Sequence, residues 1–511
     1  MKNEQGSPKA DKVKSKSLAG QAKKGILWTL LRAVSSQGAR FVASIVLARI
    51  LFPEDFGIIG IVLIVTRFAQ RLGNFGFTQV LIQKKLIDEN HIRTTFTINL
   101  ILAFLTTSII IIFAPQLATI VTNAKDVGHI DTIVDVLRVI SFSFILISLY
   151  AVPNSLLKRE LKFKQESLIG IVGGVVRFLS PIGFALFGHG VWSIVYGMLL
   201  GDLIQVIAFY SYSKWKPRIG LNKVALNNVF SFGIWMNLQS YVQYFYKNSA
   251  YFFVSKFLGL GMLGYYERAY NLMNSPRKRV SDMISSVLFA TFSRIQDEEE
   301  RLISAMRKVM GSVALLTFPL MTWLYFAAPS LIPLVYGDKW ILTVQPLQIM
   351  SISGLIESVT MVFYPVFLAK GLVKNRTKAH TIVLIFLLVS LFFSAQESIV
   401  MVAWAVVATS LFGFFVNAHE YIRNSGWTWK DNFISLKPAI SISLIMIGVI
   451  YTSQYLALNY FSFDSPAMLI VISLASALGF FGSNYIFKFA EVAEVINLVR
   501  GKKSKKSVSV A

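Results

Sequence analysis

Ser275-Pro276-Arg277-Lys278-Arg279 lies inside a long segment, residues 261–292, that otherwise has the composition of a membrane helix. Each Lys or Arg at the centre of a membrane helix costs roughly 2.5–3.5 kcal/mol on insertion scales. Three consecutive cations therefore require a position outside the membrane, or a site within it that faces water and an anion. Two spans joined by a basic loop would each have only about 15 residues, too few to cross a bilayer. We therefore predict one long helix over residues 261–293, kinked at Pro276.

The composition of the whole chain is that of a polytopic helical membrane protein. Of its 511 residues, 55% are hydrophobic and 15% are charged. Apolar runs of about 20 residues, long enough to cross a hydrocarbon core of ~30 Å, recur along the chain without the alternation of membrane β-strands. We predict an all-α membrane protein with about fourteen transmembrane helices. The expected spans are residues 25–51, 56–82, 94–121, 135–157, 167–187, 190–213, 227–255, 261–293, 306–333, 342–369, 379–395, 399–422, 434–456 and 466–487.

The loops alternate between two kinds. The basic kind includes residues 158–162, 214–218 and 374–378, whereas the turns at 52–55 and 188–189 are nearly free of Lys and Arg. The positive-inside rule then places both termini in the cytoplasm. It also accounts for the net charge of +24, so we expect no nucleic-acid partner.

An internal repeat relates the first two expected spans to the seventh and eighth. At one constant offset, Arg40 aligns with Lys247 and Arg71 aligns with Lys278. Repeats that begin on the same side of the membrane predict two parallel, pseudo-symmetric six-helix lobes around a central cavity, plus two appended helices. The predicted organisation is a basic cytoplasmic tail at 1–24, an N-lobe at 25–213, a cytoplasmic linker at 214–226, a C-lobe at 227–422, two appended spans at 434–487 and a second basic tail at 488–511.

Polar residues gather in the same four spans and recur every four positions, on single helical faces. Such stripes face a bundle interior or a water-filled cavity. Cations outnumber acids, so we predict an anionic ligand, most simply a phosphate group. The candidate ligand-binding cations are Arg32, Arg40, Arg67, Arg71, Lys247, Arg277, Lys278 and Arg279. The candidate acids for ion coupling are Asp202, Glu267, Asp282 and Glu357.

The roles of several of these residues stay open in the sequence. Arg177 and Asp202 either form a buried structural pair or contribute to the cavity. Glu357 either forms a hydrogen bond within its bundle or carries a coupling proton. Within the triplet, the repeat favours Lys278 as the ligand-binding residue, with its two neighbours as flanking charges. The sequence has no Walker P-loop, no histidine spacing typical of a metal site and no cysteine, so we expect no ATPase activity, cofactor or metal.

Three stretches resemble a known family when they are taken together and in order. They are RFVASIVLARILFPEDFGIIG at 40–60, NFGFTQVLIQ at 74–83 and GYYERAYNLMN at 264–274. The set resembles the polysaccharide-transport branch of the multidrug/oligosaccharidyl-lipid/polysaccharide (MOP) exporter superfamily, particularly the colanic-acid and teichuronic-acid exporters.

This resemblance implies a flippase rather than an enzyme. Its substrate would be an undecaprenyl-diphosphate-linked oligosaccharide that crosses the bacterial inner membrane by alternating access between two lobes. Basic residues of spans 1, 2, 7 and 8 would meet the diphosphate. The partners would be membrane lipids and the polysaccharide polymerase and glycosyltransferases of the same pathway.

Three other functions compete with this interpretation. A lipid II flippase would use the same chemistry on a different glycan. A multidrug cation antiporter would require an anionic cavity, and a membrane glycosyltransferase or polymerase would require catalytic acids or a histidine in sizeable loops. The cationic stripes and short outer loops argue against these last two.

Overall fold

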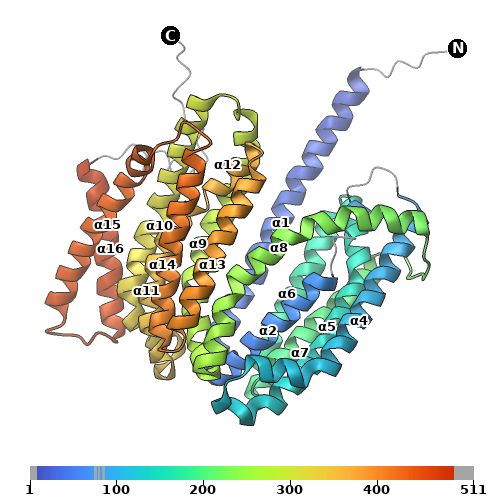
Figure 1. The fold of residues 1–511 in the computed structure, drawn as a ribbon, viewed down its shortest axis with the longest axis horizontal. Coiled ribbons are helices and arrows are strands. Elements are labelled where there is room, and N and C mark those ends of the chain that lie inside the picture. The colour runs from blue at the N-terminus through green and yellow to red at the C-terminus, as the bar shows by residue number, and fades with distance from the viewer. Residues whose placement is uncertain (1–7, 74–77, 79–80, 83–86, 214, 488–511) are drawn as a thin grey trace. The chain divides into compact units, whose positions relative to one another are not determined.

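The computed structural model describes residues 8–73, 78, 81–82, 87–213 and 215–487, and every regular element within these ranges is a helix (Figure 1). The all-α prediction is confirmed for this part of the chain. Many of the predicted spans lie within a few residues of observed helices, and α14, Ile399–Ile422, has the predicted bounds. The segment around the basic triplet is one uninterrupted helix, α9, Leu260–Arg294, which contains Pro276.

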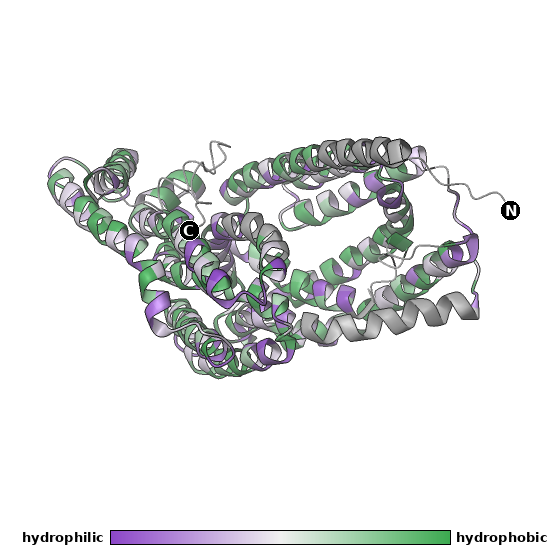
Figure 2. Cartoon of the chain, turned by 90° about the horizontal axis from the view of Figure 1, so that it is seen from above, coloured by the Kyte–Doolittle hydropathy of each residue, from purple (hydrophilic) through white to green (hydrophobic). Residues whose placement is uncertain are grey.

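Ten of the described helical segments are long and apolar enough to cross a membrane. They carry hydrophobic residues over much of their lengths (Figure 2). The four predicted spans outside this group are α1 (Pro8–Ile50), α2 (Pro53–Gly73), α8 (Lys223–Leu258) and α9. These are the helices in which the sequence concentrates its polar stripes. The total of about fourteen spans therefore stays a prediction.

The chain divides into two compact units, and the division falls inside α8. The first unit comprises Met1–Tyr244 and Gly259–Gly261, and the second comprises Phe245–Leu258 and Met262–Ala511. The lobe boundaries predicted from the sequence stay a prediction. The remaining helices of the first unit are α4 (Glu89–Val121), η1 (Ala124–His129), α5 (Ile130–Arg159), α6 (Phe163–Leu186) and α7 (Trp192–Tyr212).

Glycines in α6 let the polar face of α1 lie against the α6 backbone. A Cβ atom at Gly170 would collide with the Arg32 guanidinium, and one at Gly174 would meet the Ser36 hydroxyl. Small residues allow this kind of close helix packing in membrane proteins. Part of the first predicted polar stripe is thus in contact with a neighbouring helix of the same unit.

The turn between α8 and α9 is fixed to the first unit. Gly259 has a φ of +97°, in the left-handed region that favours glycine. The next residue, Leu260, donates its backbone N–H to Asp126 Oδ2 at 2.9 Å. On α2, a Cβ atom at Gly57 would collide with the Leu260 carbonyl, so the two backbones require glycine there.

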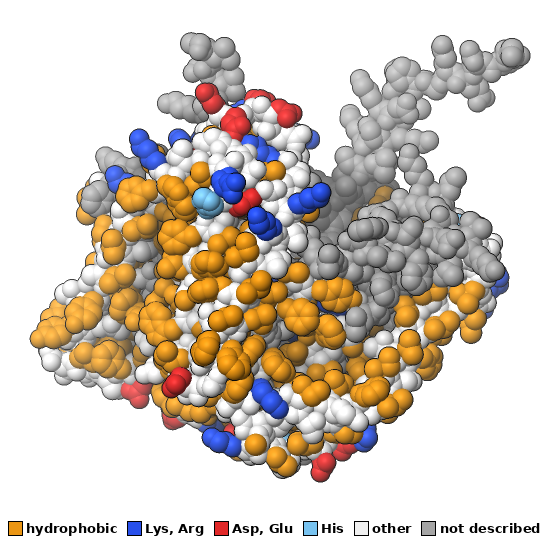
Figure 3. All heavy atoms as spheres, viewed as in Figure 1, with side chains coloured by type: hydrophobic (Ala, Val, Ile, Leu, Met, Phe, Trp, Pro, Cys, Tyr) orange, Lys and Arg blue, Asp and Glu red, His pale blue; other side chains and the backbone are white. Residues whose placement is uncertain are grey.

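The second unit is built around α10 (Glu299–Tyr336), whose buried face includes Met306, Met310 and Phe318. The other helices of this unit are η2 (Asp338–Thr343), α11 (Val344–Thr360), α12 (Phe363–Ala369), α13 (Val373–Ser394), α14, α15 (Trp429–Ala457) and α16 (Pro466–Phe487). Hydrophobic side chains cover the visible sides of these helices, and charged side chains gather toward their ends (Figure 3). This distribution fits helices that contact lipid.

The expected span over 342–369 corresponds to the segment Asp338–Ala369, which is long and apolar enough to cross a membrane. Within this segment the helix is interrupted between α11 and α12, because Pro365 has no N–H to donate to the Met361 carbonyl. One expectation for the second unit was wrong: the residues expected to form a basic loop at 374–378 are helical, because α13 begins at Val373.

Candidate functional site

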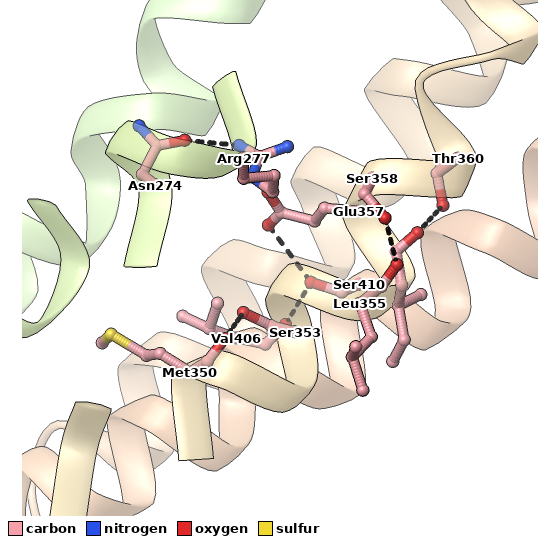
Figure 4. A network of polar contacts seen from close by, with 11 residues as sticks. Asn274, Arg277, Met350, Ser353, Leu355, Glu357, Ser358, Thr360, Val406 and Ser410 are labelled. Atoms are coloured by element: carbon pink, nitrogen blue, oxygen red, sulfur yellow. Dashed lines mark hydrogen bonds and ion pairs between the residues drawn. The ribbon is translucent and has the colours of Figure 1, made fainter. Parts of the chain in front are cut away.

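Within the basic triplet, Arg277 is the residue held inside the second unit (Figure 4). Its Nη2 lies 3.0 Å from Oε2 of Glu357 on α11, and the two side chains are only 14% and 17% exposed. The same nitrogen donates to Asn274 Oδ1 at 2.6 Å, and Ser410 of α14 donates its hydroxyl to Glu357 Oε1 at 3.2 Å. Three helices thus meet at one charged, hydrogen-bonded cluster.

Lys278 and Arg279 are exposed. Successive residues of a helix point about 100° apart, so the three cations of the triplet cannot share one environment. The repeat favoured Lys278 as the ligand-binding residue, whereas Arg277 is the one with an ion-pair partner. Ligand binding by any of the three stays a prediction. For Glu357, the hydrogen bond within the bundle is present, and its role as a coupling acid stays a prediction.

Two ion pairs in the first unit involve predicted residues. Arg32 of α1 pairs with Glu166 of α6, which is buried and also lies 3.5 Å from the Lys158 ammonium. Arg177 lies 2.5 Å from Asp202, whose side chain is completely buried. The buried Arg177–Asp202 pair that the sequence left open is therefore present. Removing one partner of such a pair strongly destabilises the folded protein, because the other charge is left buried without a counter-charge.

The other predicted cations of the first unit are more accessible. Arg40 and Arg67 are exposed on α1 and α2. Arg71 is half-buried, and its guanidinium carbon lies 5.0 Å from the centre of the Tyr244 ring, a cation–π distance. The Tyr244 hydroxyl in turn donates to the Ile64 carbonyl at 2.5 Å, which fixes this ring against α2.

The remaining predicted acids are less well defined. Glu267 is half-buried, and its Oε2 is buried without a hydrogen-bond partner. Asp282 lies in α9, but its side chain is outside the part of the chain that the structure describes. Neither residue is placed near Glu357 by a described contact.

Sequence reasoning missed a polar group on α13. Arg376 and His380 are four residues apart and thus share a helical face. The His380 ring lies 5.0 Å from the ring of Tyr246 on α8. The residue after Tyr246 in the sequence is Lys247, a predicted ligand-binding cation, which is exposed. The signal in the sequence was the four-residue spacing, which was hidden because Arg376 was assigned to a loop.

The first unit also contains a cavity of about 160 Å³ between α2, α4 and α5. Most of its lining is apolar, and its polar side chains include Gln70, Asn99, Thr106 and Ser148. The Asn99 Nδ2 is buried and has no hydrogen-bond partner in the described structure. A cavity of this size with several polar side chains can hold water molecules. Among the described residues, no group of three His, Asp or Glu side chains is arranged to bind a metal ion.

Comparison with known proteins assigns the family. Residues 46–346, more than half of the chain, match the family model described as "Polysaccharide biosynthesis protein". The chain belongs to this family. The resemblance predicted from the three sequence stretches is thereby confirmed.

Individual relatives align over most of the chain. The succinoglycan biosynthesis transport protein ExoT of Rhizobium meliloti is 25% identical over 472 residues, which cover 88% of this chain and 90% of ExoT. The teichuronic acid biosynthesis protein TuaB of Bacillus subtilis is 23% identical over 90% of this chain and 95% of TuaB. The lipopolysaccharide biosynthesis protein WzxC of Escherichia coli is 24% identical over 66% of this chain and 67% of WzxC.

Solved structures identify the fold. The lipid II flippase MurJ in an inward closed conformation superimposes with a TM-score of 0.73 at 17% identity, over 90% of this chain and 98% of MurJ. An inward-facing multidrug transporter of the MATE family, in the MOP superfamily, gives a TM-score of 0.62 at 14% identity, over 77% of this chain and 97% of that protein. The protein therefore has the fold of MOP-superfamily membrane transporters.

Proposed function

We propose that this protein moves a polyprenyl-diphosphate-linked oligosaccharide across the bacterial cytoplasmic membrane by alternating access. The observation that carries the proposal is the family match over residues 46–346, because its relatives ExoT, TuaB and WzxC are named for polysaccharide transport or biosynthesis. The reaction makes and breaks no covalent bond, so the protein acts as a transporter rather than an enzyme. Polysaccharide polymerase and glycosyltransferases would act on the same lipid-linked sugar.

The proposal includes an arrangement of the membrane helices. Fourteen spans would form two lobes around a central cavity, with both termini in the cytoplasm. The polar helices α1, α2, α8 and α9 would line this cavity, because their exposed cations require water or an anion rather than lipid. The polyprenyl chain would stay in the bilayer, since each buried CH₂ is stabilised there by about 0.8 kcal/mol.

The accessible cations are the best candidates to bind the diphosphate. Arg40, Arg67, Lys247 and Lys278 are exposed, and Arg71 is half-buried beside an aromatic ring. Arg279 is exposed too. Arg32 and Arg277 already have carboxylate partners, so an incoming phosphate would have to compete with those carboxylates.

This competition gives Glu357 a mechanistic role in the proposal. If the diphosphate takes Arg277 from Glu357, the carboxylate is left without its counter-charge in a largely buried place, so Glu357 is the first candidate for ion coupling. Glu267 and Asp282 remain secondary candidates for coupling, whereas the complete burial of Asp202 beside Arg177 favours a structural role.

The proposal is tested by polymer export in living cells. The host strain lacks its own polysaccharide flippase and carries the biosynthetic genes that act with this protein. Arg40→Ala, Arg71→Ala, Lys247→Ala and Lys278→Ala are introduced one at a time, with Lys430→Ala on the exposed start of α15 as the control. A hydrogen bond to a charged group contributes about 1.5–3 kcal/mol, so we expect export to fall roughly tenfold to a hundredfold.

Normal export by all four variants at wild-type abundance would refute the shared-cation model. A lipid II flippase is the alternative from the same fold, because that fold is shared with MurJ. Rescue of a strain depleted of its lipid II flippase, without restoration of polysaccharide export, would favour this alternative.

A further inference from the structure

Several arginines within the helices have a carboxylate partner, but Arg376 has none among the described residues. Arg32, Arg177 and Arg277 pair with Glu166, Asp202 and Glu357. The Arg376 guanidinium instead lies against the Tyr364 ring, 3.6 Å from its centre. Its Nη1 is buried and donates to nothing in the described structure. A buried charge without a counter-charge is costly, so this position favours an anion.

A second unpartnered nitrogen lies on the same face of α13. The Nε2 of His380 is buried and has no hydrogen-bond partner in the described chain. The His380 ring lies 5.0 Å from the ring of Tyr246 on α8, and Lys247 is the next residue of that helix. Side chains of α8 and α13 that carry nitrogen thus lie on neighbouring helices of the second unit.

The start of α13 adds positive potential to this position. The first turn of α13 contains no acidic residue, and no side chain caps its N-terminus. The N-terminus of a helix carries a partial positive charge. On α14, Glu420 accepts a hydrogen bond from Asn375 at 2.6 Å, and it does not form an ion pair with Arg376.

We propose that Arg376, His380 and Lys247 form a phosphate-binding subsite in the second unit. One phosphate group of the substrate's diphosphate would accept hydrogen bonds from Arg376 Nη1 and from the Nε2–H form of His380, and Lys247 would contribute its charge. The identity of this ligand rests on the proposed function. The subsite shares no residue with the Arg277–Glu357 cluster, where a carboxylate of the protein already occupies the arginine.

The subsite is tested by binding of inorganic pyrophosphate to the purified full-length protein in phosphatidylcholine nanodiscs. The variants are Arg376→Gln and His380→Gln, and the matched control is Lys378→Gln, an exposed cation of the same helix. Size-exclusion chromatography confirms that each variant is folded, and Arg376→Lys replaces Arg376→Gln if the latter is not. We expect the pyrophosphate Kd to rise at least tenfold in both subsite variants and to stay unchanged in the control.

The outcomes separate the subsite from the function on which it rests. No binding to the wild type, or binding to both subsite variants with the wild-type Kd, would overturn the subsite and leave the transport proposal standing. Nanodiscs that contain phosphatidylglycerol provide the second arm. Loss of pyrophosphate binding in these nanodiscs would assign the subsite to a phospholipid headgroup and overturn its role in substrate binding. Intact binding without transport of lipid-linked sugar would instead refute the proposed function.

Discussion

The Arg277–Glu357 pair should contribute measurably to stability because it is largely buried. Glu357→Ala leaves Arg277 without a carboxylate and removes one of the two acceptors near the Ser410 hydroxyl, which keeps the Val406 carbonyl. Breaking a fully buried pair costs about 3–5 kcal/mol, and a charged hydrogen bond contributes about 1.5–3 kcal/mol. Since both side chains keep some exposure, we expect Glu357→Ala to lower the free energy of unfolding by about 2–3 kcal/mol.

A double-mutant cycle isolates the interaction. Glu357→Ala, Arg277→Met and the double variant are unfolded in mixed micelles, and helix content is followed by circular dichroism. Adding Arg277→Met to Glu357→Ala should restore about 2 kcal/mol of the lost free energy of unfolding, because Arg277→Met removes the unpaired charge.

The exposed Arg301–Glu298 pair is the matched control. It has the same separation of 3.0 Å, but its side chains are 69% and 54% exposed. Pairs of this kind contribute about 0.2–1 kcal/mol. Equal coupling energies in the two cycles would refute the conclusion that burial makes the Arg277–Glu357 pair strong.

Three further predictions concern single positions. Gly57→Ala places a methyl group against a backbone carbonyl and should lower the free energy of unfolding by about 1–3 kcal/mol. Gly38 has open space around it, so Gly38→Ala should raise the free energy of unfolding by about 0.5 kcal/mol. Chemical denaturation that ranks the two variants the other way would contradict the packing. Asp202→Asn weakens an ion pair whose carboxylate is completely buried and should lower the thermal midpoint; an unchanged midpoint would exclude the structural role. The His91 backbone N–H donates to Asp88 and holds the pKa of that carboxyl below its unfolded value of 3.8. This contribution to stability is present above pH 3.8 and is lost as the pH falls through the lowered pKa. In that pH range, hydrogen exchange at the start of α4 should increase in the wild type and should not change in Asp88→Ala.

Helix positions were predictable because membrane helices must be long and apolar. The errors lie where this rule gives no information. The first turns of α10 and α13 are polar, so their starts at Glu299 and Val373 were placed too late along the chain. The interruption before α12 depends on how Pro365 affects local hydrogen bonding, whereas Pro276 is accommodated within α9.

The candidate site was only partly predictable, because a sequence shows which residues share a helical face but not which helix lies opposite. The Arg177–Asp202 pair was foreseen as an option, since both residues are costly in a membrane without a partner. The partner of Arg277 was not foreseen, because Glu357 is distant in the sequence. His380 was also missed as a candidate residue, because its contact with Tyr246 of α8 is not visible from the residues around it in the sequence.

Transport in proteoliposomes tests the central claim most directly. The substrate is an undecaprenyl-diphosphate-linked disaccharide with a fluorophore on its sugar, and external dithionite bleaches only the sugars on the outer leaflet. A proton gradient and a membrane potential are imposed in separate samples. With the purified protein present, we predict that bleaching rises from about half of the fluorescence to nearly all of it under at least one condition, because labelled lipids reach the outer leaflet during the assay. Bleaching that stays at the level of protein-free liposomes under every condition would contradict the account.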